Sequence, residues 1–281
     1  MTAEVGAPPL RSLSPQTPAV AVRVEGLTRR FGKLVAVDHI TFDVARGEVF
    51  GFLGPNGAGK STTIKMLTTM LRPTEGTATL NGCDIVRDQT RARREFGIVF
   101  QDTTVDTELT AYENMELHAV LYGVPDAEIP GRVRSLLELV KLADRAGDYV
   151  KTFSGGMVRR LEVARGLIHD PSILFLDEPT IGLDTQTRVL LWDHIREMNR
   201  DSGTTVFFST HYIEEAEMVA DRIAIIDFGR IVALGSVDEL KRETGTETLE
   251  QAYLKLTGTT IREERVQGGD QWRERIRGQR R

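Results

Sequence analysis

A glycine-rich segment that ends in a lysine and a serine is the first part of the chain whose chemistry follows from its residue types. Residues 54–61 read Gly-Pro-Asn-Gly-Ala-Gly-Lys-Ser. Glycines let the backbone turn its N–H groups inward around an anion, and a following helix adds its positive N-terminal end. Lys60 can reach the β- and γ-phosphates of a nucleoside triphosphate, and the Ser61 hydroxyl can ligate Mg²⁺. The pattern predicts a phosphate site formed by Gly54, Pro55, Asn56, Gly57, Ala58, Gly59, Lys60 and Ser61.

An acidic pair closes a second apolar segment. Residues 173–176 read Ile-Leu-Phe-Leu, which is typical of a buried strand, and Asp177 and Glu178 follow directly. A carboxylate at the carboxyl end of a parallel strand points into the crevice where ligands bind. We expect Asp177 to serve Mg²⁺ through water and Glu178 to be the general base that polarises the attacking water. A fortuitous glycine turn and a solvated acidic turn are the alternatives, and the presence of both motifs argues against them.

Two other polar residues also follow short apolar strands. Gln101 comes directly after the segment 97–100, where its amide can contact Mg²⁺ and the attacking water. His211 follows the segment 205–208, and its imidazole can reach a γ-phosphate in the same crevice. In isolation each would be an ordinary polar residue at the end of a strand, and the other motifs favour the functional interpretation. The remaining histidines carry no motif and are expected at the surface or with satisfied partners in the core: His39, His118, His169 and His194.

A Ser-Gly-Gly turn predicts a second anion site. Ser154 can N-cap the helix that follows, and Gly155 and Gly156 allow a phosphate to approach its first N–H groups. The apolar stripe of that helix comprises Leu161, Ala164, Leu167 and Ile168. One chain has no evident need for two γ-phosphate sites, so we expect the second site to serve the nucleotide of another chain. For the tripeptide alone, a simple Ser-capped helix is the plainer interpretation.

The order of apolar segments predicts an α/β fold. Helical periodicity lies between segments typical of strands, which favours a largely parallel sheet. An N-terminal antiparallel β subdomain is expected to precede this sheet. The predicted strands cover residues 21–24, 40–44, 48–53, 77–80, 97–100, 173–176, 205–208, 222–226 and 231–234.

Residues from about 102 to 163 read as a mostly helical subdomain inserted between strands. Thr110 and Glu113 have capping-box spacing, and hydrophobic residues follow at helical intervals at Leu117, Val120 and Leu121. Pro130 can open a second helix, whose apolar face comprises Val133, Leu136, Leu137 and Val140. We expect one domain at 20–258 that ends with a short amphipathic helix. A disordered extension at 1–19 and a flexible basic tail at 259–281 would flank it.

The composition excludes several classes of function. Hydrophobic residues make up 40% and charged residues 27% of the 281 residues, as in an ordinary globular domain. No apolar run approaches the ~18 residues of a membrane-spanning helix, and the N-terminus lacks the order of a signal peptide. The net charge of -5 gives no electrostatic case for nucleic acid. The single cysteine, Cys83, excludes an intramolecular disulfide. Any work at a membrane would depend on a partner subunit.

Together, these motifs resemble those of the ATP-binding subunits of ABC transporters, over about residues 20–258. The matching segments come in the order and spacing of that family: residues 54–62, Gln101, residues 153–157, residues 173–178, residues 182–184 and His211. The resemblance implies a P-loop NTPase core that binds ATP and Mg²⁺ and hydrolyses ATP. It adds Thr62 and Asp184 to the nucleotide site. It also adds Phe31, at the position where an aromatic ring, more often tyrosine, stacks on adenine.

The same resemblance implies partners. Each ATP would lie between the phosphate loop of one subunit and Ser154, Gly155 and Gly156 of the other, in a head-to-tail dimer. The second subunit would be another copy or a homologous ATPase. A separate integral membrane permease would hold the pair at the cytoplasmic face of the cell membrane, and no nucleic acid partner is expected.

Details of the motifs favour one subgroup. Phe153 and Met157 replace the commoner leucine and glutamine, and residues 249–258 add a matching C-terminal segment. These features resemble the daunorubicin-resistance type of exporter ATPase, although Thr185 stands where that group usually has proline. Relatives of that type move drugs, polyketides, lipids or glycans. A regulatory ATPase without a transport partner and an importer ATPase are the alternatives.

Overall fold

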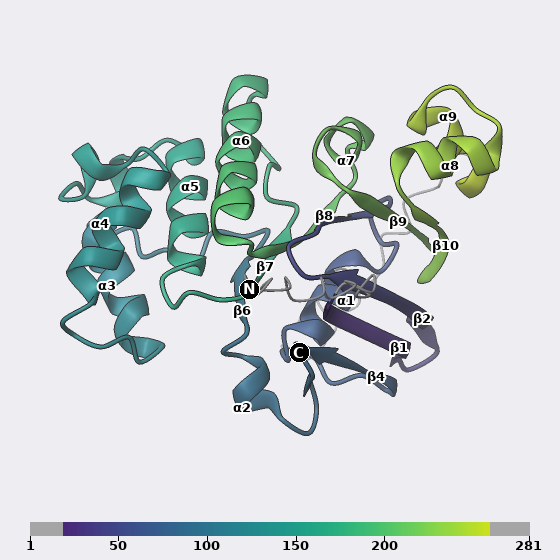
Figure 1. Ribbon diagram of the computed structural model, residues 1–281, viewed down its shortest axis with the longest axis horizontal. Coiled ribbons are helices and arrows are strands. Elements are labelled where there is room, and N and C mark those ends of the chain that lie inside the picture. The colour runs from purple at the N-terminus through teal and green to yellow at the C-terminus, as the bar shows by residue number, and fades with distance from the viewer. Residues whose placement is uncertain (1–18, 259–281) are drawn as a thin grey trace, which may run out of the picture.

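The computed structural model describes residues 19–258, which form two sheets flanked by helices (Figure 1). The tail at 259–281 and all of the extension at 1–19 except its last residue lie outside the described residues. The first sheet is antiparallel, with strand order β2-β1-β4-β5. Its strands are β1 (Val20–Phe31), β2 (Leu34–Ala45), β4 (Glu75–Leu80) and β5 (Cys83–Asp84). The expected N-terminal antiparallel sheet is therefore present, with β1 and β2 longer than their apolar segments indicated.

The second sheet carries the ends of the strands from which the site is built. Its order is β10-β9-β3-β8-β7-β6, with parallel pairing throughout except between β9 and β10. The strands are β3 (Val49–Leu53), β6 (Phe96–Val99), β7 (Ile173–Asp177), β8 (Thr205–Thr210), β9 (Arg222–Asp227) and β10 (Arg230–Gly235). Every residue of β3, β7 and β8 is buried, which explains their continuous apolar runs. The predicted α/β class with a largely parallel sheet is confirmed.

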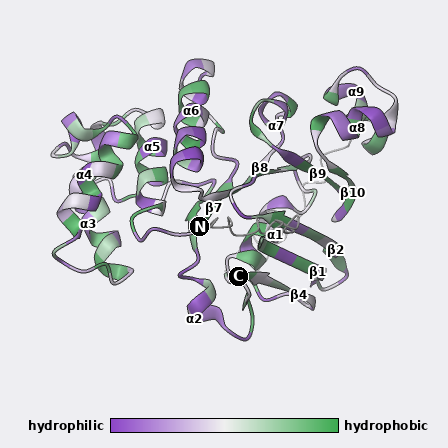
Figure 2. Cartoon of the chain, viewed as in Figure 1, coloured by the Kyte–Doolittle hydropathy of each residue, from purple (hydrophilic) through white to green (hydrophobic). Residues whose placement is uncertain are grey.

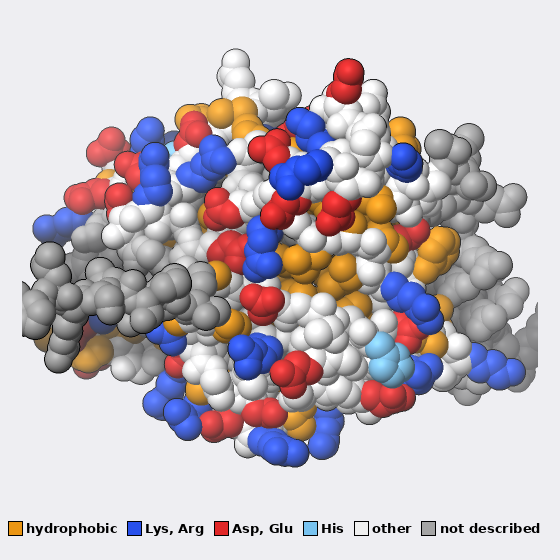
Figure 3. Space-filling view, turned by 45° about the vertical axis from the view of Figure 1, so that its right-hand side comes forward, with side chains coloured by type: hydrophobic (Ala, Val, Ile, Leu, Met, Phe, Trp, Pro, Cys, Tyr) orange, Lys and Arg blue, Asp and Glu red, His pale blue; other side chains and the backbone are white. Residues whose placement is uncertain are grey.

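The two sheets share one core. Phe42 of β2 stacks on Phe50 of β3 with ring centroids 5.5 Å apart, and Phe207 of β8 packs against both rings. Hydrophobic residues concentrate on the strands, while the helices around them present mixed faces (Figure 2). These helices are α1 (Lys60–Leu67), α2 (Gln89–Ala92), α6 (Thr185–Ser202), α7 (Ile213–Val219), α8 (Val237–Thr244) and α9 (Leu249–Thr257). On the face drawn in Figure 3, positive and negative side chains alternate around a central group of hydrophobic side chains.

Residues 102–163 hold helices at one end of the molecule (Figure 1). They contain α3 (Ala111–Leu121), α4 (Ile129–Leu139), two 3-10 turns at Ala143–Arg145 and Val150–Thr152, and most of α5 (Gly155–Gly166). The predicted capping box of Thr110 and Glu113 opens α3, and Pro130 lies in the first turn of α4. Ser154 N-caps α5, since its Oγ accepts a hydrogen bond from the Met157 backbone N–H.

The hydrophobic residues that the spacing groups on α3 do not enter the core. Leu117, Val120 and Leu121 are 51%, 55% and 72% exposed. The helix instead buries Ala111, Met115 and Ala119 in the cluster that α4 and α5 also line. The two alanines on this face let α3 lie close to its neighbours, and Leu117, Val120 and Leu121 face outward.

The helical region is joined to the sheet through a contact between two glycines. A Cβ at Gly97 of β6 would overlap the carbonyl oxygen of Gly166 at the end of α5. We expect Gly97→Ala to lower the free energy of unfolding by about 1–3 kcal/mol, because the strand and the helix would have to separate. Denaturant unfolding measures this change. Gly131→Ala in α4, where an added Cβ meets nothing within 4 Å, is the matched control. A Gly97→Ala protein as stable as the control would contradict this packing.

Candidate active site

The predicted phosphate loop connects β3 to α1. Gly59 adopts a left-handed backbone conformation, with φ of 109°, and is the N-cap of α1, which begins at Lys60. A Cβ at Gly59 would lie 2.6 Å from the Ala36 carbonyl oxygen, so both conformation and space require glycine there. A Cβ at Gly54 would overlap the Ile226 carbonyl oxygen. The pattern seen in the sequence therefore follows from close backbone packing around the start of α1.

Lys60 is buried beside the loop and already has an anionic partner. Its Nζ donates to the carbonyl oxygens of Gly54 at 2.7 Å and Pro55 at 3.1 Å, and it lies 3.1 Å from Glu178 Oε1. The side chain is only 3% exposed. Burial lowers the pKa of Lys60, and the negative charge of Glu178 opposes that shift. A phosphate that enters the loop would meet a desolvated cation, which strengthens its electrostatic attraction.

Two of the three residues predicted to hold Mg²⁺, Ser61 and Asp177, lie in contact. Ser61 Oγ donates to Asp177 Oδ1 at 3.1 Å, and Asp177 is 4% exposed at the end of β7. The Ser61 hydroxyl and the Gln101 amide lie in one cavity wall, and the Asp177 carboxylate contacts that hydroxyl. Together they provide oxygen ligands of the kind Mg²⁺ prefers. The residues present thus fit this metal ion.

Ser209 is a site residue that motif reading missed. Its Oγ donates to Asp177 Oδ1 at 2.7 Å and accepts from the Glu178 backbone N–H at 3.0 Å. The parallel register of β7 and β8 pairs Asp177 with Ser209, which brings these groups together. Its position two residues before His211 was the available signal, but it required the strand pairing to be known.

Glu178 connects the lysine to the histidine. Its Oε2 lies 2.9 Å from His211 Nδ1, while Oε1 contacts Lys60. The side chain is 8% exposed, and the backbone has a φ of 49°, which is uncommon for a residue with a side chain. A carboxylate held by a cation on one side and an imidazole on the other has the position of a general base oriented by its neighbours.

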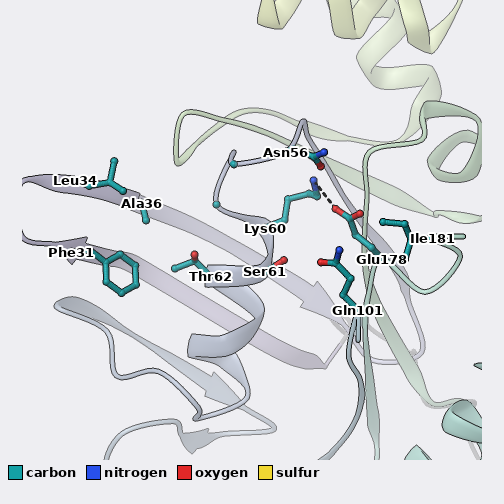
Figure 4. A pocket seen from close by; sticks show the side chains of 12 residues that line it. Phe31, Leu34, Ala36, Asn56, Lys60, Ser61, Thr62, Gln101, Glu178 and Ile181 are labelled. Atoms are coloured by element: carbon teal, nitrogen blue, oxygen red, sulfur yellow. Dashed lines mark ion pairs between the residues drawn. The ribbon is translucent and has the colours of Figure 1, made fainter. Parts of the chain in front are cut away.

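Lys60, Ser61 and Glu178 line a cavity of about 440 Å³. In Figure 4, Phe31 and Leu34 lie at one end, and Lys60, Gln101 and Glu178 lie at the other. An aromatic, half-exposed end and a charged end match the two parts of a nucleotide. The predicted residues in the wall are Phe31, Asn56, Gly57, Gly59, Lys60, Ser61, Thr62, Gln101 and Glu178, and the unpredicted ones are Leu34, Ala36 and Ile181.

The Phe31 ring has one face covered by the Arg29 side chain. The Arg29 guanidinium lies 4.5 Å from the centre of the Phe31 ring, a cation–π contact. The ring is 45% exposed, so surface remains for a second stacking partner. The ring therefore has the support and the exposure that an adenine platform needs.

Other predicted residues lie outside the wall of this cavity. His211 lines a neighbouring cavity and reaches the site through its bond to Glu178. Ser154, Gly155 and Gly156 form the start of α5, and Asp184 N-caps α6 by accepting from the Thr187 backbone N–H at 3.0 Å. Within one chain, the structure does not bring these four residues into the cavity wall.

Known proteins resemble this chain over most of its length. It is 42% identical to a daunorubicin resistance ATP-binding protein of Streptomyces coeruleorubidus, over 86% of this chain and 80% of that one. It is 45% identical to the Nod factor export ATP-binding protein I of Ralstonia nicotianae, over 81% and 71%. A dimeric ATP-binding cassette solved with ADP and Pi matches with a TM-score of 0.68 and 28% identity, over 76% of this chain and 98% of that one. The family model described as ABC transporter matches residues 37–181. The chain therefore belongs to the ABC transporter family as one of its ATP-binding subunits.

Proposed function

We propose that this protein hydrolyses ATP to drive export of a drug, polyketide, lipid or glycan through a separate membrane permease. The observation that carries the proposal is Glu178, held between Lys60 and His211 beside the Ser61–Asp177 contact. This arrangement suits hydrolysis of a triphosphate at one end of a cavity whose other end suits adenine. The resistance and export functions in the names of the relatives support export.

Each residue has a role in this reaction. The phosphate loop and Lys60 bind the phosphates, and Lys60 exchanges its contact with Glu178 for a contact with the γ-phosphate. Ser61, Asp177 and Gln101 would hold Mg²⁺, which when bound neutralises charge that develops on the phosphate oxygens. Glu178, released from Lys60, polarises the attacking water. His211 keeps the Glu178 carboxylate oriented and faces the γ-phosphate.

A second subunit completes the site in this proposal. Four predicted residues lie outside the cavity of their own chain, at the exposed N-termini of α5 and α6: Ser154, Gly155, Gly156 and Asp184. A helix N-terminus with an open serine and two glycines suits a γ-phosphate, so a head-to-tail dimer gives these residues a ligand. The related cassette that is dimeric with ADP and Pi supports a dimer.

The domain limits and the location follow from the same proposal. Residues 20–258 form the ATPase domain, and 102–163 form the helical subdomain that contacts the permease. Among residues 19–258, no helix has both the length and the apolar character needed to cross a bilayer. We place the protein at the cytoplasmic face of the membrane, held there by the permease. The exposed side chains of Leu117, Val120 and Leu121 offer an apolar contact on α3.

Affinity purification from membranes tests this function. The tagged protein, purified from membranes of the cells that naturally make it, should retain one integral membrane protein. Replacing Leu117, Val120 and Leu121 together with serine should reduce that retention and leave ATP hydrolysis by the isolated subunit unchanged. Recovery of ribosomes without any integral membrane protein would instead favour a regulatory ATPase.

A further inference from the structure

A buried carboxylate outside the cavity joins the two segments that carry the catalytic pair. Glu215 lies on α7 and is 2% exposed. Its Oε1 accepts a hydrogen bond from Thr180 Oγ1 at 2.5 Å, and its Oε2 accepts one from Thr210 Oγ1 at 2.8 Å. Thr180 lies two residues after Glu178, and Thr210 directly precedes His211. One side chain therefore holds both residues that flank the Glu178–His211 contact.

Arg188 supplies the counter-charge and extends the connection to α6. Its Nε lies 3.3 Å from Glu215 Oε1, and its guanidinium lies 4.4 Å from the centre of the Tyr212 ring. That ring packs against the His211 ring with centroids 4.1 Å apart, and the Tyr212 backbone N–H donates to Thr210 Oγ1. Glu215 and Arg188 thus contact the two residues that flank His211 in the sequence, Thr210 and Tyr212.

We propose that Glu215 is a positioning residue, with Arg188 as its counter-ion, that fixes the distance between Glu178 and His211. Burial of a carboxylate is costly unless it is hydrogen-bonded and paired with a cation, so Glu215 holds its two threonine donors and the Arg188 cation in one arrangement. The chain between each threonine and its catalytic neighbour is too short to absorb a shift. A displacement of about 1 Å at a catalytic group can cost about a hundredfold in rate. The inference rests on the proposed ATP hydrolysis and adds a residue that does not touch the nucleotide.

Glu215→Gln and Thr180→Val each weaken one side of the connection at nearly constant size. We expect either change to lower kcat for ATP hydrolysis by about tenfold or more, with the Kd for ATP within about twofold of the starting protein. Thr180→Ser keeps the hydroxyl and should retain kcat. Glu217→Gln, on an exposed position of the same helix, is the matched control. If Glu215→Gln does not fold, the comparison of Thr180→Val with Thr180→Ser carries the test.

A double-mutant cycle separates positioning from simple stabilisation. Single-turnover hydrolysis is measured for His211→Ala with and without the change at Thr180 or Glu215. If Glu215 acts through His211, the second substitution costs little once the imidazole is absent. Equal costs in both backgrounds, or parallel losses of kcat and ATP affinity, would overturn the positioning role. A different result would contradict the proposed function itself: an unmodified protein that hydrolyses ATP no faster than Glu178→Gln.

Discussion

Replacing Glu178 with glutamine should abolish steady-state ATP hydrolysis and leave ATP bound. Glutamine keeps the shape of the side chain but loses its basicity, and loss of a general base costs about 10²–10⁴ in rate. The Lys60 contact predicts the effect on binding. In the starting protein, ATP must displace a carboxylate that lies 3.1 Å from Lys60 Nζ. A neutral amide competes less well for that cation, so the variant should bind ATP at least as tightly.

Two measurements check this result together. Phosphate release reports turnover, and size-exclusion chromatography with ATP and Mg²⁺ reports the dimer, which should persist because hydrolysis no longer opens it. Glu214→Gln, on an exposed position of α7, is the control and should keep both properties of the starting protein. An ATPase rate in Glu178→Gln equal to that of the control would remove Glu178 from the role of general base.

The site could be predicted from the sequence where its residues are contiguous. The phosphate loop joins β3 to α1, and Asp177 ends a fully buried strand, so pattern and spacing were sufficient. Ser209 and Glu215 could not be found this way. Each depends on a pairing between segments more than thirty residues apart, which only the register of β7 and β8 and the packing of α7 define.

The strands of the fold could be predicted from local sequence patterns, but the orientation of helix α3 could not. Continuous or alternating apolar runs indicated the strands, because burial on one or both faces is a local requirement. The outward face of α3 was not predictable, since periodicity gives a stripe but not its direction. The inner face of α3 is occupied by Ala111, Met115 and Ala119, which pack against α4 and α5. Leu117, Val120 and Leu121 are left exposed, as expected for a surface that meets a partner.

A mixed dimer in which one subunit carries Ser154→Asp and the other carries Lys60→Met should keep one working ATP site. In a head-to-tail dimer, the altered loop and the altered serine meet at the same nucleotide, and the other site has both native parts. Aspartate is suited to this test because it retains the N-cap of α5 while placing a negative charge toward the γ-phosphate. Lys60→Met removes the buried cation at similar length.

The matched control is a mixed dimer in which one subunit carries both substitutions and its partner carries neither. With both changes in one chain and a native partner, a head-to-tail dimer has one defect in each site, so both sites lose hydrolysis. The number of ATP molecules bound per dimer and the rate of hydrolysis distinguish these cases. If each chain instead formed a complete site alone, the outcomes would be reversed, with activity retained when both substitutions share a chain. Ser154 would then be no more than the N-cap of α5, and the second anion site would have no nucleotide to bind.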